Sequence, residues 1–123
     1  MSDEWLVEYT DEFEAWWDTL APPVQEKVSA VVELLEEEGP RLGFPYSSEI
    51  KGTESALREL RVQYAGRPYR ILYAFDPVRA ALLLIGGDKT GNNRWYEQMI
   101  PIAERLFKEH LMELKESHNE RTS

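Results

Sequence analysis

Three strand patterns follow one another closely between residues 57 and 86, and they constrain the fold more than any other feature. Residues 57–64 and residues 69–76 each alternate between two faces, with the period of two that a strand requires. Residues 79–86 are nearly all apolar, which is typical of a strand covered on both faces. Because Gly66 and Pro77 lie in the short connections, we expect an antiparallel meander.

Helical patterns lie on either side of these strands. Apolar residues from Phe13 to Leu20 recur at helical spacing, with Thr10 or Asp11 as the expected N-cap. A second helix is expected from about Pro23 to Glu38, and a third from about Arg94 to Glu116. Pro101 fits the third helix only near its first turn or at a kink. The first two helices are expected to form a hairpin that packs on the sheet.

The remaining segments complete an α+β fold. Residues 4–9 form a short strand candidate, residues 39–56 are predicted to be a loop region, and residues 86–93 a glycine-rich loop. The predicted architecture is a small antiparallel sheet, made of the N-terminal strand and the three-stranded meander. The helical hairpin and the C-terminal helix pack against this sheet.

A chain of 123 residues favours a single domain. We expect that domain to cover residues 1–116, followed by a frayed tail over residues 117–123. No segment reaches the roughly 18 apolar residues of a membrane span, and the N-terminus is acidic where a secretory signal is basic. We therefore expect a cytoplasmic protein with no membrane partner.

Charge is distributed unevenly along the chain. The formal net charge is −9, and residues 1–56 contribute 3 basic and 14 acidic side chains. Residues 57–96 contribute 7 basic and 3 acidic side chains, and most of these cations are arginines. An arginine has a planar fork that matches phosphate. These arginines therefore either pair with carboxylates of the chain itself or bind a phosphate.

Composition removes several kinds of chemistry. The chain has no cysteine, so disulfides, thiolate metal sites and a cysteine nucleophile are excluded. It has only two histidines, so a metal site made of several histidines is not expected. The segment Gly86–Gly91 lacks the spacing of a nucleotide-binding phosphate loop. Glu59, Asp76 and Asp88 lie among arginines, which favours salt bridges over a metal site. No metal and no cofactor are therefore expected.

Metal-free cleavage of RNA is the chemistry that the central cations favour. RNA carries its own nucleophile, the 2′-hydroxyl, so an enzyme must move two protons and stabilise the charge on phosphorus. The candidate catalytic residues are Arg61, Arg70, Lys89, Arg94 and Tyr96. Neighbouring guanidinium groups are expected to lower the pKa of the lysine or the tyrosine, which would make it a better base.

The same residues carry a resemblance to a known family. Leu57-Arg-Glu-Leu-Arg61, Gly66-Arg-Pro-Tyr-Arg70-Ile-Leu-Tyr73, Gly87-Asp-Lys89 and Arg94-Trp-Tyr96 are similar to motifs of the RelE/ParE toxin superfamily, in its HigB-like, phage-derived branch. The resemblance covers residues 4–115. Family members often carry a lysine pair where this chain has Asp88-Lys89.

This resemblance implies a RelE-like fold and the toxin of a type II toxin–antitoxin pair. Many of its members are endoribonucleases that cleave mRNA without a metal, often on the ribosome, and the resemblance implies this activity here. It implies a partner antitoxin, commonly a helix-turn-helix DNA-binding protein. It also implies a phosphate-contacting role for Arg70 and a catalytic role for Tyr96. Further RNA contacts are expected at four positions: Lys51, Arg58, Arg67 and Tyr73.

Two other interpretations stay open at this point. The chain can be a binding protein of the same fold, either one that poisons another target, as ParE-like members do with gyrase, or a degenerate toxin that only binds its antitoxin. The acidic N-terminal part favours this alternative. The chain can also be a structural phage protein of the same ancestry.

Overall fold

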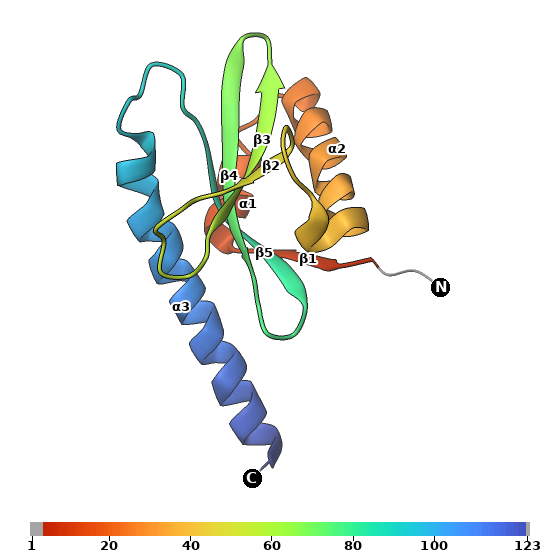
Figure 1. The fold of residues 1–123 in the computed structure, drawn as a ribbon, viewed down its shortest axis with the longest axis vertical. Helices are drawn as coiled ribbons and strands as arrows, with labels where there is room; N and C mark the ends of the chain where they lie inside the picture. Colours follow the sequence, from red (N-terminus) through yellow and green to blue (C-terminus); the bar gives the residue numbers. More distant parts are fainter. Residues whose placement is uncertain (1–3, 123) are drawn as a thin grey trace.

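A computed structural model describes residues 4–122, with side chains described for residues 4–118, and shows a five-stranded mixed sheet between helices (Figure 1). The strand order across the sheet is β1-β5-β4-β3-β2. The strands are β1 (Leu6–Tyr9), β2 (Ser47–Glu49), β3 (Arg58–Tyr64), β4 (Arg67–Phe75) and β5 (Ala80–Asp88). The helices are α1 (Asp11–Trp17), α2 (Pro22–Glu38), the 3-10 turn η1 (Gly39–Arg41) and α3 (Trp95–Thr122).

The helices cover the two faces of the sheet separately. On one face α1 and α2 pack on alternate residues of the meander, including Leu60, Ile71 and Leu83. On the other face α3 packs on the intervening residues, including Leu72 and Leu84. The predicted alternation of β3 and β4 is therefore confirmed, as is the α+β class. Strands β4 and β5 bury residues on both faces because each face has its own helical layer.

The beginning of α1 follows the predicted N-cap. Thr10 has extended backbone, and its hydroxyl oxygen accepts a hydrogen bond from the Phe13 amide at 3.0 Å. This bond satisfies one of the amides that the first helical turn leaves without a partner. The Thr10 hydroxyl also donates to the Leu84 carbonyl at 2.6 Å, which fixes the start of α1 to the central strand β5.

The pairing of strands corrects the predicted sheet in two ways. Strand β1 pairs with β5 in parallel, with Leu6 opposite Ala80, so the sheet is mixed rather than antiparallel. The segment predicted as a loop contains β2, which pairs antiparallel with β3. Its residues Ser47-Ser48-Glu49 have no apolar alternation, and backbone pairing with β3 forms the strand without that signal.

The glycine-rich loop prediction is wrong at its start, because β5 continues through Gly86 and Gly87 to Asp88. A Cβ on Gly86 would collide with the indole of Trp16 from α1, and a Cβ on Gly87 would collide with that of Trp95 from α3. The two glycines therefore make room for one tryptophan on each face of the strand. Trp95 is the first residue of α3, so this packing also positions the beginning of that helix.

Helix α3 extends beyond its predicted end at Glu116 and continues to Thr122. The segment after Glu116 contains no glycine or proline that would terminate a helix, which explains the extension. Pro101 lies inside α3, in its second turn. Within residues 4–122, no helix has both the length and the apolar character that crossing a membrane requires.

Candidate active site

A carboxylate lies at the centre of the predicted catalytic cluster. Glu59 is on β3, on the face covered by α3, and only 7% of its surface is exposed. Its Oε1 accepts a hydrogen bond from the Tyr96 hydroxyl at 2.6 Å, and its Oε2 accepts one from the Ser48 hydroxyl at 2.9 Å. Three elements, β2, β3 and α3, therefore hold one carboxylate in place.

Two arginines approach this carboxylate from β3 and β4. The strand register places Arg61 directly opposite Arg70. The Nη1 of Arg61 lies 3.6 Å from Oε2 of Glu59, and the Nε of Arg70 lies 3.4 Å from Oε1. Charge attraction rather than hydrogen bonding joins Arg70 to Glu59, because this Nε has no hydrogen-bond partner among the described residues.

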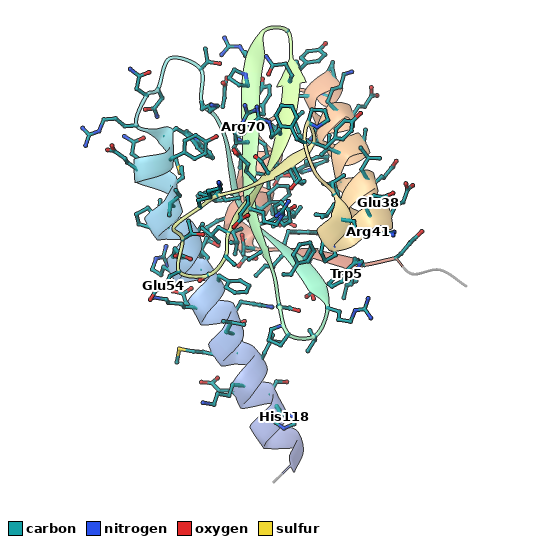
Figure 2. All side chains as sticks on the ribbon, in the orientation of Figure 1. Trp5, Glu38, Arg41, Glu54, Arg70 and His118 are labelled. Carbon is teal, nitrogen blue, oxygen red and sulfur yellow. The ribbon has the colours of Figure 1, made fainter. Side chains whose placement is uncertain are left out.

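The two arginines differ in their access to solvent. The side chain of Arg70 is 6% exposed and lies against the central strands of the sheet (Figure 2), where its Nη1 donates to the Tyr69 carbonyl at 3.0 Å. The side chain of Arg61 is 29% exposed, and its guanidinium stacks over the ring of Phe44, 5.2 Å from the ring centroid. Arg61 can therefore contact an anion that binds from solvent, whereas the buried Arg70 positions Glu59.

Lys89 and Tyr96 complete the cluster. The ammonium of Lys89 lies 5.2 Å from the centroid of the Tyr96 ring, a cation–π contact. Lys89 follows the last residue of β5, and its amide donates to the Pro68 carbonyl at 3.0 Å. No described carboxylate pairs with its ammonium. The cluster thus contains three cations, Arg61, Arg70 and Lys89, around the single carboxylate of Glu59.

The prediction that guanidinium groups lower the pKa is wrong for Tyr96. Burial raises the pKa of the Tyr96 phenol, and the hydrogen bond and negative charge of Glu59 raise it further. Arg70 lowers this pKa, but its effect is smaller than the combined effect of burial and Glu59. Tyr96 therefore stays protonated and donates to Glu59, so the carboxylate rather than the phenol is the group able to accept a proton.

Three predicted residues lie away from the cluster. Arg94 is exposed just before α3 and pairs with Glu97, with Nε 3.1 Å from Oε2. Arg67 is at the start of β4 and pairs with Asp88 at 2.8 Å. Burial raises the pKa of the Asp88 carboxyl, but the hydrogen bonds from Thr90 and the pair with Arg67 together outweigh it and lower that pKa. Lys51 is exposed in the turn after β2 and has no ion pair among the described side chains.

Arg58 and Tyr73, expected to contact RNA, lie on the opposite face of the sheet. Tyr73 is fully buried, and its hydroxyl lies 2.6 Å from the hydroxyl of Ser47. The Nε of Arg58 donates to the Tyr73 hydroxyl at 3.2 Å, and its Nη2 donates to the Leu42 carbonyl at 3.2 Å. Arg58 therefore links Leu42, in the segment before β2, to the sheet, and Tyr73 contacts the first residue of β2.

Sequence reasoning missed Glu59 and Ser48 as site residues and Phe44 as their neighbour. Glu59 is a salt-bridge partner, as its arginine neighbours predict, but its central position is not evident from that pairing. The available signal is its place two residues before Arg61, on the same face of one strand. Ser48 and Phe44 gave no signal, because their segment has the composition of a loop.

Metal-ligating geometry is not found near the cluster. Among the residues described here, no three histidine or carboxylate side chains come together as a metal site requires. The three cations already supply positive charge beside Glu59. The arrangement therefore provides an anion-binding arginine, a proton acceptor and an ammonium donor within one cluster.

Comparison with known proteins places this chain in a family. The model of the family described as phage-derived protein Gp49-like (DUF891) matches residues 15–108, which include every member of the cluster. The chain belongs to this family. The Gp49-like chain is 46% identical over 94 residues to HigB3 of Mycobacterium tuberculosis, named as a toxin, and covers 81% of that protein.

A second relative is longer than this chain. The Gp49-like chain is 40% identical over 110 residues to HigB2 of Mycobacterium tuberculosis, also named as a toxin. The match covers 87% of this chain and 55% of that relative, so the chain spans about half of the relative's length. The two matches confirm the resemblance to HigB-like proteins.

Solved structures confirm the RelE-like fold. A mutant of the E. coli toxin RelE in the free state has a TM-score of 0.59 at 14% identity, covering 76% of this chain and 93% of RelE. The archaeal RelE–RelB complex from Pyrococcus horikoshii has a TM-score of 0.53 at 19% identity, covering 72% of this chain and 98% of the matched chain. At these identities the likeness concerns the fold.

Proposed function

We propose that this Gp49-like chain is the toxin of a type II toxin–antitoxin system and an endoribonuclease that cleaves mRNA without a metal ion. The observation that carries the proposal is the carboxylate of Glu59, held by Tyr96 and flanked by Arg61 and Arg70. Its family relatives are named as toxins, which supports the biological role. Action on the ribosome belongs to the same proposal.

The reaction follows from the positions of the charged groups. Arg61 binds the scissile phosphate, and Glu59 takes the proton of the neighbouring 2′-hydroxyl. The 2′-oxygen then attacks phosphorus while the bond to the 5′-oxygen breaks. Lys89 gives a proton to that leaving oxygen, because its ammonium has no carboxylate partner among the described residues, whereas the Tyr96 proton is held by Glu59. The products are a 2′,3′-cyclic phosphate and a 5′-hydroxyl.

The proton donor has a specific test. Replacing the 5′-oxygen with sulfur gives a leaving group that needs no acid. We expect Lys89→Ala to lower cleavage of ordinary RNA about 10²- to 10⁴-fold and to leave cleavage of the thio-substrate near the wild-type rate. Equal losses on both substrates would refute the assignment of Lys89 as the acid.

The proposed function is tested by controlled expression in a bacterium, with growth and mRNA 5′ ends measured together. The wild-type chain is compared with Arg61→Ala, with the double variant Arg70→Ala and Tyr96→Phe, and with Arg105→Ala as a control outside the cluster. Arrest with new 5′ ends, lost in the cluster variants and kept in the control, supports the nuclease. Arrest without new ends would indicate another target such as gyrase, and no arrest at verified expression would indicate a binding-only protein.

The partner proposed with this function is an antitoxin, of the helix-turn-helix class that the resemblance implies. Complexes of RelE-fold toxins with antitoxins, such as RelE–RelB from Pyrococcus horikoshii, support the proposal. A groove between β1, α1 and α2 offers the surface, with Val7, Phe13 and Val28 in its lining. The groove is also lined by four carboxylates that form no ion pair with any described residue: Glu14, Asp18, Glu33 and Glu36. Their charge favours an antitoxin segment that combines apolar side chains with lysine or arginine.

A further inference from the structure

An aromatic side chain is exposed to solvent beside the proposed catalytic cluster. Phe44, in the segment before β2, is 77% exposed, the largest value among the large hydrophobic residues described. Its ring contacts the guanidinium of Arg61, and that guanidinium also lies 3.6 Å from Glu59. The Arg61 guanidinium therefore lies between the exposed ring of Phe44 and the carboxylate of Glu59.

A small cavity joins this ring to the two arginines. It has a volume of about 180 Å³ and is lined by Phe44, Pro45, Val62, Gln63 and the two site arginines. Its walls combine an aromatic ring, aliphatic carbons and one amide side chain. Gln63 is exposed, and no described residue forms a hydrogen bond with its side-chain amide. These are the elements that recognise a nucleobase, whose face stacks and whose edge forms hydrogen bonds.

We propose that this cavity is a nucleobase subsite, which holds the base of the nucleotide next to the scissile phosphate. The base stacks on Phe44 in place of the Arg61 guanidinium, and Arg61 moves its contact from the ring to the phosphate. The Gln63 amide donates to, or accepts from, the edge of the base. This inference rests on the proposed function, because it assumes an RNA substrate at Arg61.

The energy of such a contact is large enough to measure. Stacking a base on an aromatic side chain contributes about 1–3 kcal/mol, which corresponds to about a 5- to 150-fold change in affinity. Phe44 is exposed, so replacing it removes little folding energy and leaves the cluster in place. The variant Phe44→Leu keeps an apolar side chain but removes the aromatic face.

The test uses a short RNA with one 2-aminopurine, whose fluorescence decreases when the base stacks. A 2′-deoxy sugar at the reactive nucleotide prevents cleavage. The 2-aminopurine is placed in turn at the two nucleotides that flank this phosphate. We expect the wild-type chain to quench one of these positions, and Phe44→Leu to weaken binding about 5- to 150-fold and to abolish the quenching. Tyr9→Leu, a matched change at an exposed aromatic residue of β1, is expected to change neither.

The outcomes separate the subsite from the catalytic proposal. Equal quenching and affinity in Phe44→Leu and the wild type, or no quenching by the wild type, would overturn the subsite. If the wild type quenches, Phe44→Leu does not, and the wild type leaves the all-ribose RNA uncleaved, the subsite is supported and the nuclease proposal fails. If the all-ribose RNA is cleaved while Phe44→Leu still quenches, the subsite alone fails.

Discussion

The substitution Glu59→Gln tests the chemistry at the centre of the site. It replaces the carboxylate with an amide of nearly the same shape. The amide oxygen can still accept the hydrogen bond from Tyr96 or from Ser48. What disappears is the negative charge, which lies 3.6 Å from Arg61 and 3.4 Å from Arg70. The variant therefore separates the role of the charge from the role of the shape.

The expected effect on cleavage follows from the role of a general base. Proton transfer by a positioned side chain contributes roughly 10²- to 10⁴-fold to the rate. This range equals roughly 3–5 kcal/mol of activation free energy. An amide cannot accept the proton of the 2′-hydroxyl, so we expect Glu59→Gln to lose cleavage within this range.

The same change has a cost in stability, and Arg70 sets its size. With its side chain 6% exposed, Arg70 would be a buried cation without a counter-charge. Removing one partner from a buried ion pair costs about 3–5 kcal/mol, whereas the more exposed Arg61 adds little. A domain of this kind has a stability of about 5–15 kcal/mol, so the variant should remain folded but melt earlier.

The assay combines urea denaturation with cleavage of a labelled RNA. Cleavage is measured at a temperature where both chains are folded. Glu49→Gln is the matched control, because Glu49 is an exposed residue of the neighbouring strand β2. It should leave stability and rate unchanged. A folded Glu59→Gln chain that cleaves within about threefold of the wild type would refute the assignment of Glu59 as the base.

Three further predictions concern Tyr96, the turn between β4 and β5, and the groove proposed for the antitoxin. Because burial and Glu59 raise the pKa of Tyr96, its contribution to stability should be complete below the ordinary phenol value of about 10 and lost as pH rises through the raised value. Absorbance titration at alkaline pH should therefore lose a high transition in Tyr96→Phe relative to the wild type. Asp76 is buried at the β4–β5 turn, where its carboxylate accepts hydrogen bonds from two backbone amides and lies 2.8 Å from the His110 ring. Asp76→Ala should therefore lower the free energy of unfolding, measured in urea, by about 3 kcal/mol or more, and a loss under about 1 kcal/mol would contradict this reasoning. Reversing charge at the groove with Glu14→Lys and Glu33→Lys should leave RNA cleavage intact and weaken neutralisation by a co-expressed antitoxin, whereas Glu37→Lys should not; unchanged neutralisation would exclude this groove as the docking surface.

The meander was predictable because its signals are local. Alternation along β3 and β4 specifies which residues face α3, and the hairpin through Gly66 determines their register. These two local features are enough to place Arg61 and Arg70 on neighbouring strands. The N-cap at Thr10 was predictable for the same reason, since the capping bond spans three residues.

The missed features depend on residues distant in sequence. The parallel pairing of β1 with β5 places Leu6 opposite Ala80, and the sequence of neither strand indicates which strand it pairs with. The Gly86–Gly87 pair resembles a loop because its reason lies elsewhere, in Trp16 and Trp95. The pKa of Tyr96 was mispredicted because burial and Glu59, both consequences of packing, outweigh the arginines.

Net charge is a weaker guide to this site than the sequence suggests. The acidic residues of α2 lie on the opposite side of the sheet from the cluster (Figure 1). A helix is about 10 Å in diameter, and charges are screened over about 8 Å at physiological ionic strength. The outer carboxylates of α2 are therefore too distant to cancel the field at Arg61. The cluster contains three cations and one carboxylate, so a chain of net charge −9 can present a locally positive site.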